Sequence, residues 1–381
     1  MTTDQDPGHL RGQLGEAVAT MLDRQYSFEQ RQQYREDPHG YSHDVWRAYA
    51  ELGLLGLGVS EEHGGFGGGL QDMGVVFERL GAALNLEPLL TTIVFGGRLI
   101  DAAGSPEQKA AWLPPLVSGD LVVALAHDEP QSRYGSMSVR TAARSSSRGW
   151  VLSGEKRLVA GGDAAGLLVV SSLTQGEAGQ EELALWLINP EAEGVRRRRR
   201  QSFDGGGLAD IILDEVHLGP GDRLGGNGAR SHLEHALDEA TALQCADAVG
   251  AMAAANSLSV DYARTRTQFG APIGSFQALQ HRLVDMVIAE KMAAAMTEAA
   301  LSALDRGRSD AAQLVSAAKV CVGQSARLVG QETVQMHGGM GLADEYPAAH
   351  YFARLGLFER RWGDADHHIT RFAELSRQAR N

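Results

Sequence analysis

Cysteine is scarce in this sequence, with only Cys245 and Cys321 among 381 residues. Both stand in Ala-rich segments of helical pattern, so we expect two small buried side chains rather than a disulfide or a metal-binding pair. No apolar run approaches the length of a membrane span. The first residues have neither the basic nor the apolar stretch of a secretion signal. These absences predict a cytoplasmic protein with no membrane partner.

Positive charge is also in short supply, because 35 Lys and Arg residues stand against 48 Asp and Glu residues and the net charge is −13. Such a chain has no overall attraction for a polyanion, which argues against nucleic acid as a partner. A local Arg can still bind a phosphate, so phosphate-bearing small ligands are compatible with this charge. The length is sufficient for two or three domains with cores of their own.

The sequence pattern divides the chain into an N-terminal helical domain over 1–118, a middle β-domain over 119–224 and a C-terminal helical bundle over 225–381. Helical spacing of apolar residues occurs in 10–24, 44–55, 75–84 and 94–103, and Ser105 followed by Pro106 is typical of a helix start. Alternation with a period of two predicts strands at 121–126, 150–154, 166–171, 183–188 and 210–213. Long amphipathic segments at 231–265, 275–306, 310–337 and 346–361 predict a four-helix bundle, with a shorter last helix at 365–377.

A run of five arginines occupies 196–200 in the middle β-domain. It could hold a phosphate or an acidic partner. Alternate residues of a strand face opposite sides, so one ligand cannot meet all five side chains. We therefore favour a solvated or subunit-facing edge strand.

The corner between two of the long helices, residues 262–277, has the side chains expected of a nucleotide site. Arg266, Gln268 and Phe269 precede a Gly-Ala-Pro break, and Phe276 and Gln277 begin the next helix. An Arg fork suits a diphosphate, an amide can fix a polar edge, and an aromatic ring can lie on a flat one. Taken alone, an exposed helix corner with a solvated Arg explains the pattern equally well.

A second motif, Gln-Met-His-Gly-Gly-Met-Gly at 335–341, follows the third long helix. Its glycines let a backbone approach a phosphate or ribose closely, although glycine is also the usual signal of a helix C-terminus. The pairing of Arg-x-Gln-Phe-Gly…Phe-Gln with Gln-x-His-Gly-Gly-x-Gly resembles the acyl-CoA dehydrogenase family of flavoproteins. The resemblance extends from about Trp46 to the last helix.

This resemblance implies the acyl-CoA dehydrogenase fold, mainly α with a middle, barrel-like β-domain, and FAD as the cofactor, with the flavin diphosphate at a subunit interface. The two motifs lie on helices far apart in the sequence, so we expect them to serve the site from different protomers. By resemblance, one protomer would hold flavin mainly with Arg266, Gln268, Phe269, Phe276 and Gln277. The neighbour would approach the adenosine end with Gln335, His337, Gly338 and Gly339.

The middle β-domain matches the family pattern only in part. Glu129-Pro130 resembles its Thr-Glu-Pro turn with Asp128 in the Thr position, and Gln131-Ser-Arg-Tyr stands where Gly-Ser-Asp usually follows. Gly154-Glu-Lys156 matches a Gly-x-Lys turn. The Trp-Ile-Thr-Asn that normally touches the flavin ring is replaced by Leu158-Val-Ala-Gly161, so ordinary ring contacts are not expected.

The catalytic base of the family is missing from both of its usual places. The reaction needs a carboxylate to take the α-proton while the flavin takes the β-hydride. Most members have this Glu near the C-terminus, at the position of Trp362 here, and a minority have it at the position of Ala240. Glu239 is next to Ala240, but one residue along a helix turns a side chain by about 100°. We expect Glu239 to point elsewhere.

An acidic and histidine-rich segment follows Trp362, with Asp364, Asp366, His367 and His368. A replacement base or a metal cluster is one interpretation. The spacing does not put a pair of metal ligands on one helix face. A helix N-cap and solvated first turn is the role we favour for Asp364 and Asp366.

Together these departures resemble the small subunits of heteromeric acyl-CoA dehydrogenases, such as pimeloyl-CoA dehydrogenase and the paired steroid side-chain dehydrogenases. In such pairs one subunit typically supplies the base and both help to hold flavin. The resemblance implies a role in fatty acid or steroid degradation, an α2β2 assembly or a homotetramer, and electron-transfer flavoprotein or a similar acceptor. The alternatives are a self-sufficient homo-oligomer with a displaced base, a structural subunit without substrate, and a flavin monooxygenase on the same fold.

Overall fold

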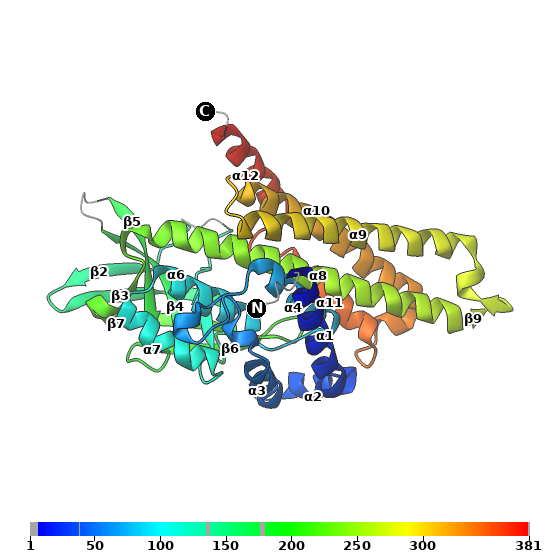
Figure 1. Cartoon of the computed structure of the whole chain (residues 1–381), viewed down its shortest axis with the longest axis horizontal. Helices are drawn as coiled ribbons and strands as arrows, with labels where there is room; N and C mark the ends of the chain where they lie inside the picture. The colour runs from blue at the N-terminus through cyan, green and yellow to red at the C-terminus, as the bar shows by residue number, and fades with distance from the viewer. Residues whose placement is uncertain (1–6, 38, 135–137, 176–179, 380–381) are drawn as a thin grey trace, which may run out of the picture. The chain divides into compact units, whose positions relative to one another are not determined.

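The computed structural model describes residues 7–37, 39–134, 138–175 and 180–379 (Figure 1). Its N-terminal part is helical, with two short turns, η1 (Leu54–Gly56) and η2 (Glu61–His63). The helices are α1 (Pro7–Gln25), α2 (Phe28–Glu36), α3 (His43–Glu51), α4 (Leu70–Ala82), α5 (Leu89–Thr91), α6 (Leu99–Ala103) and α7 (Pro106–Val117). Strands follow and then helices again, so the mainly helical class with a sheet in the middle of the chain is confirmed.

Helix α7 begins as its sequence predicted. The Ser105 hydroxyl accepts a hydrogen bond from the Gln108 amide at 3.2 Å, and the Gln108 side chain accepts one from the Ser105 amide at 3.0 Å. Pro106 occupies the first helical position, where its missing N–H costs nothing. The N-terminus of α7 is therefore capped by local side chains.

The segment before α6 differs from prediction, because η3 (Thr92–Arg98) is a π-helix rather than an α-helix. It packs against strand β1 (Val123–Ala126): a Cβ at Gly96 would lie 2.7 Å from Val123 Cβ, and the Thr92 hydroxyl accepts a hydrogen bond from the Val123 amide at 3.3 Å. A π-turn holds an extra residue and shifts the helix face that follows it. The π-turn therefore sets the direction of the side chain of Arg98, the last residue of η3.

The middle of the chain forms one sheet with the order β6-β7-β3-β2-β4-β5-β8, to which β1 is added parallel to β4. Its core is apolar, with Leu152 and Trp186 fully buried. Strand β2, inside this sheet, was not predicted. The strands are β2 (Ala142–Ser146), β3 (Gly149–Ala160), β4 (Leu167–Gln175), β5 (Glu181–Ile188), β6 (Val195–Gln201), β7 (Gly207–Leu218) and β8 (Arg223–Leu224), with η4 (Pro220–Asp222) before β8.

The turn expected at Gly154-Glu-Lys156 is wrong, because these residues lie inside β3. The pairing of β3 with β7 shifts register between Leu152 and Gly154. A Cβ at Gly154 would lie 2.3 Å from the Thr141 hydroxyl. The glycine therefore serves a close contact within the sheet rather than a turn.

The arginine run forms the edge strand β6, as predicted. Its side chains alternate between faces and have different partners. Arg200 donates to Asp210 at 2.9 Å, whereas Arg197 donates to the carbonyl of Ala165 at 3.0 Å. The run is thus consistent with a structural edge.

Long helices make up the C-terminal part (Figure 1). They are α8 (Ala229–Thr265), α9 (Gln277–Asp305), α10 (Ala311–His337), α11 (Pro347–Phe358) and α12 (Ala365–Gln378), as the spacing predicted. Short elements join them: η5 (Gly226–Gly228) precedes α8, strands β9 (Thr267–Gln268) and β10 (Ala271–Pro272) with η6 (Ile273–Ser275) separate α8 from α9, and η7 (Gly338–Leu342) follows α10. Cys245 is buried and Cys321 half-buried, and both are free thiols.

The chain forms two compact units. One contains the chain up to Gln32, Gly69–Asn85 and everything from Thr241 onward, and the other contains Gln33–Gly68 and Leu86–Ala240. Secondary structure changes close to the predicted boundaries, since α7 ends at Val117 and β8 at Leu224. The compact units cut across those boundaries, so the three-domain division stays a prediction.

Candidate functional site

The arginine motif forms an exposed hairpin between α8 and α9. Phe269 and Gly270 make its two-residue turn, and both have positive φ, at 53° and 80°. That combination is typical of the tight turns that match strand twist. Phe269 is 93% exposed, and the Arg266 side chain makes no ion pair with any residue that the structure describes. Both side chains are thus available to a ligand or another subunit.

The glycine motif ends helix α10 and opens η7. Gly338 has φ 57° and ψ −135°, a conformation that side-chain-bearing residues avoid. A Cβ at Gly338 or Gly339 would meet no atom within 4 Å. The backbone there is open on its outer side, and Gln335 is exposed beside it. This geometry suits the close approach of a phosphate or ribose.

His337 joins the two motifs inside one protomer. Its ring lies 4.5 Å from that of Tyr262, one turn before Arg266, and 5.2 Å from that of Tyr346. The two motifs are therefore neighbours within one chain, and their service to the site from different protomers stays a prediction. Helices distant in sequence pack side by side here, which helical spacing alone does not reveal.

His337 itself is an internal residue, only 3% exposed. Its Nδ1 donates to the Thr333 carbonyl at 2.8 Å, and Nε2 is buried. Burial lowers the pKa of His337, which keeps the ring neutral. The His337 side chain therefore packs inside the protein and is not part of the exposed surface of the site.

Two other motif residues, Glu129 and Lys156, meet in the core of the β-domain. The Lys156 ammonium donates to Glu129 at 2.7 Å and to Ser171 at 3.1 Å, and both charged groups are buried. Burial alone would raise the pKa of Glu129, but Lys156 and the Thr141 hydroxyl hold it below its usual range. The pair fixes the turn after β1.

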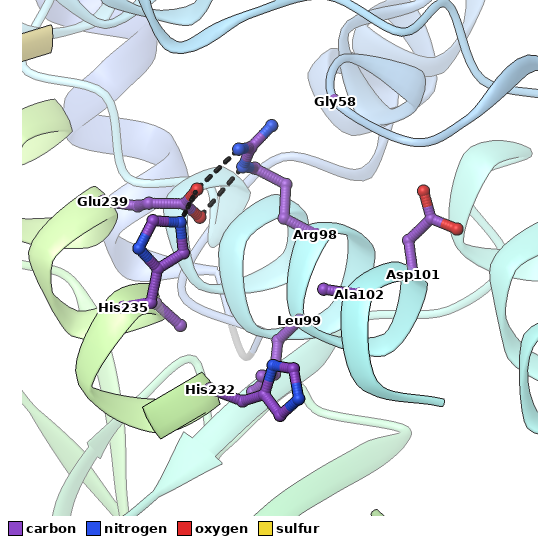
Figure 2. Close-up of a pocket in the computed structure, with 9 residues that line it drawn as sticks. Gly58, Arg98, Leu99, Asp101, Ala102, His232, His235 and Glu239 are labelled. Atoms are coloured by element: carbon purple, nitrogen blue, oxygen red, sulfur yellow. Dashed lines mark hydrogen bonds and ion pairs between the residues drawn. The ribbon is translucent and has the colours of Figure 1, made fainter. Parts of the chain in front are cut away.

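Glu239 points away from the position of the family's alternative base, as predicted. Arg98 donates to its carboxylate twice, at 2.9 and 2.5 Å, and His235 Nε2 lies 3.2 Å from it (Figure 2). Burial raises the pKa of Glu239, but His235 and Arg98 lower it more, so the carboxylate is a weakened base. Ala240 is fully buried. The partner Arg98 was not identified from the sequence, because nothing local links positions 98 and 239.

Trp362 lies in a fixed turn between α11 and α12. It has φ 53°, its carbonyl accepts a hydrogen bond from His368 Nε2 at 2.9 Å, and a Cβ at Gly363 would lie 2.5 Å from that same nitrogen. Asp364 accepts from the His367 amide at 3.0 Å and is the N-cap of α12, as predicted. Within the described ranges, no group of three His, Cys, Asp or Glu side chains is arranged to hold a metal ion.

Comparison with known proteins decides the family. A model of the N-terminal domain of acyl-CoA dehydrogenases matches residues 12–120, and a model of their C-terminal domain matches residues 226–373. Acyl-CoA dehydrogenase fadE12 of Mycobacterium bovis is 31% identical over 318 residues, 82% of each chain. The chain belongs to the acyl-CoA dehydrogenase family.

Solved structures of this family are similar over nearly the whole chain. The ChsE4–ChsE5 complex from Mycobacterium tuberculosis is 25% identical with a TM-score of 0.87, covering 98% of this chain and 97% of that one. A variant of the Tcur3481–Tcur3483 steroid ACAD is 26% identical with a TM-score of 0.88, covering 98% and 99%. The acyl-CoA dehydrogenase family is FAD-dependent, so FAD, expected from the motifs, is confirmed as the cofactor. Among the described residues, no helix is long and apolar enough to cross a membrane.

Proposed function

We propose that this chain is one subunit of an FAD-dependent acyl-CoA dehydrogenase in which a different subunit supplies the carboxylate base. The observation that carries the proposal is the state of the two base positions. Ala240 and Trp362 occupy them, and the adjacent Glu239 is held by Arg98 and His235. The acids nearest in sequence to these two positions already have structural roles. Glu239 belongs to an ion-pair cluster, and Asp364 caps a helix.

The residues at the hairpin and the glycine loop fit a flavin dinucleotide. Arg266 presents a guanidinium that has no ion-pair partner among the described residues, Gln335 presents an amide, and Gly338 and Gly339 leave the backbone open. Arg266 would bind the diphosphate bidentately, and the glycines would let main-chain groups approach the adenosine part. Gln268, Phe269, Phe276 and Gln277 would complete this end of the site. When bound, FAD supplies the acceptor for the hydride from the β-carbon of the acyl group.

An oligomer is supported by apolar side chains on the surface near this site. Phe269 and Phe276 contact each other edge to face, 6.3 Å apart, and both are exposed. Helix α9 exposes further apolar side chains at helical spacing: Val284, Val287, Ile288 and Met292. Contiguous exposed apolar surface is typical of subunit interfaces. We infer that a partner subunit covers it, in an α2β2 assembly or, in the alternative, a homotetramer.

The neighbours named ChsE4–ChsE5 and Tcur3481–Tcur3483 each consist of two named components, and one of them is called a steroid ACAD. They support a heteromer and an acyl-CoA that belongs to steroid or fatty acid degradation. Electron-transfer flavoprotein, or a similar protein, would reoxidise the flavin. We place this reaction in the cytoplasm.

Co-purification tests the assembly directly. The chain would be tagged and isolated from its native host, and its partners identified by mass spectrometry together with the flavin absorbance. A second acyl-CoA dehydrogenase chain with a Glu at one of the two base positions, in equal amount and with bound flavin, is the expected result. A yellow, catalytically competent oligomer of this chain alone would favour the self-sufficient alternative, and a colourless one would favour a structural subunit.

A further inference from the structure

The glycine loop, residues 338–346, needs contacts with the rest of the protein to keep one shape. It opens with the sequence Gly-Gly-Met-Gly, and each glycine adds backbone freedom that is lost when the loop adopts a single conformation. Gly341 is packed against the end of α10, because a Cβ there would lie 2.7 Å from the Val334 carbonyl. Gly338 and Gly339 have open space beside them. Their position therefore depends on how the second half of the loop is held.

The carbonyl of Asp344 holds that second half. It accepts a hydrogen bond from His350 Nε2 at 2.8 Å and another from Gln32 Nε2 at 2.8 Å. His350 belongs to α11 and Gln32 to α2, so side chains from two helices meet at one carbonyl of the loop. The end of the glycine loop is thus tied to a helix near the N-terminus of the chain.

Arg31 determines which nitrogen of His350 carries the hydrogen. A guanidinium can only donate, and Arg31 Nη1 lies 3.0 Å from His350 Nδ1. Nδ1 must therefore accept, and Nε2 bears the hydrogen that points at the Asp344 carbonyl. Arg31 is itself fixed, since it is 1% exposed and its Nε donates to the Leu84 carbonyl at 2.8 Å. The Asp344 carboxylate also lies 3.3 Å from Nε2, but it is 64% exposed, so solvent weakens this contact.

We infer that His350 and Gln32 are positioning residues for the cofactor. Both fix the Asp344 carbonyl, and this in turn holds the backbone of Gly338 and Gly339 in place toward FAD. Neither side chain touches the cofactor itself. The role of these two residues rests on the proposed function, because it requires FAD to lie against the glycine loop.

Hydrogen exchange of the amides of 338–346, followed by mass spectrometry on the holoprotein with any partner, tests this role. The FAD dissociation constant is measured in parallel. His350→Leu removes one donor from the Asp344 carbonyl, so loop exchange and the FAD dissociation constant should each rise about tenfold. His350→Gln keeps an amide N–H donor on the same helix and should return both to within about threefold of the wild type.

Tyr351→Phe is the matched control. Tyr351 is the next residue of α11 and donates its hydroxyl to the Ala82 carbonyl at 2.6 Å, away from the loop. Its loss removes a hydrogen bond of the same helix and should leave loop exchange and FAD binding unchanged. Gln32→Ala is a second test, because it removes the other donor from the Asp344 carbonyl and should also raise loop exchange.

The role is overturned if loop exchange stays unchanged in His350→Leu, if it rises equally in Tyr351→Phe, or if His350→Gln restores nothing. A raised loop exchange with an unchanged FAD dissociation constant overturns it as well. If His350→Leu does not fold, Gln32→Ala decides in the same way. A protein that binds no flavin in any variant would refute the proposed function, whereas loop exchange, which needs no FAD, would still report on the contact of His350 with the loop.

Discussion

The ammonium group of Lys319 donates a hydrogen bond of 2.6 Å to the carbonyl oxygen of Phe358, the last residue of α11. It also donates to the Arg361 carbonyl at 2.8 Å and to the Gln244 amide oxygen at 3.1 Å, and its side chain is 2% exposed. Helix ends leave carbonyls without partners. Lys319 closes the end of α11 and anchors the turn that carries Trp362.

Removal of this ammonium should destabilise the protein. In Lys319→Met three acceptors lose their donor, two of them buried, and each buried unsatisfied polar group costs about 1–3 kcal/mol. We expect the free energy of unfolding in urea to fall by at least about 2 kcal/mol. Lys291→Met, at an exposed lysine on α9, is the control and should stay within about 0.5 kcal/mol of the wild type. Equal stability of the two variants would contradict this role of Lys319.

The histidine that holds Trp362 should make stability depend on pH. Burial lowers the pKa of His368 from the ordinary 6.5 of a histidine to about 3. Between these values the unfolded chain binds a proton that the native protein does not, so the free energy of unfolding falls as the pH drops from 6.5 toward 3. His368→Gln, which can still donate to the Trp362 carbonyl, should reduce this slope by about 1.4 kcal/mol per pH unit. Urea unfolding at pH 7, 6 and 5 measures it, and an unchanged slope would rule out a neutral buried His368.

Two glycines set the crossing of α4 and α8. A Cβ at Gly250 would lie 1.8 Å from the Glu78 carbonyl, and a Cβ at Gly81 would lie 1.9 Å from the Asp247 carbonyl. Gly250→Ala must push the helices apart, and overpacking of this kind costs about 1–3 kcal/mol. Gly12→Ala, in α1, meets no atom within 4 Å and should instead stabilise by about 0.5–1 kcal/mol. Thermal unfolding of both variants would show opposite shifts, and a stabilised Gly250→Ala would refute the close crossing.

Local pattern predicted the helices and most strands, because burial of one face imposes a period of 3.6 or 2 on the sequence. It also predicted Ser105 as a cap and the arginine run as an edge strand. Contacts between distant segments were beyond it. Nothing in the sequence near Arg98 indicates that its partner is Glu239. Helical spacing also cannot distinguish the π-helix that ends at Arg98 from an ordinary α-helix. The motif residues were found by type, but the contact between the His337 and Tyr262 rings depends on how α8 and α10 pack.

The hairpin arginine should determine cofactor retention. Arg266→Ala removes a charge-assisted contact to the flavin diphosphate, worth about 1.5–3 kcal/mol. We expect FAD to dissociate more readily from this variant, co-expressed with any partner, when flavin per protomer is measured after gel filtration. Arg264→Ala is the matched control, since Arg264 lies two residues earlier and is paired with Asp261. Full flavin occupancy in Arg266→Ala would remove Arg266 from the site.

The central claim is that this chain lacks a catalytic base, and turnover by the purified chain tests it most directly. The chain would be reconstituted with FAD and assayed with a panel of acyl-CoAs and an artificial electron acceptor. Because loss of general-base help costs about 10²–10⁴ in rate, we predict no measurable dehydrogenation until a Glu-bearing partner subunit is added. Robust turnover by the chain alone, abolished in Asp364→Asn or Glu239→Gln, would contradict the account.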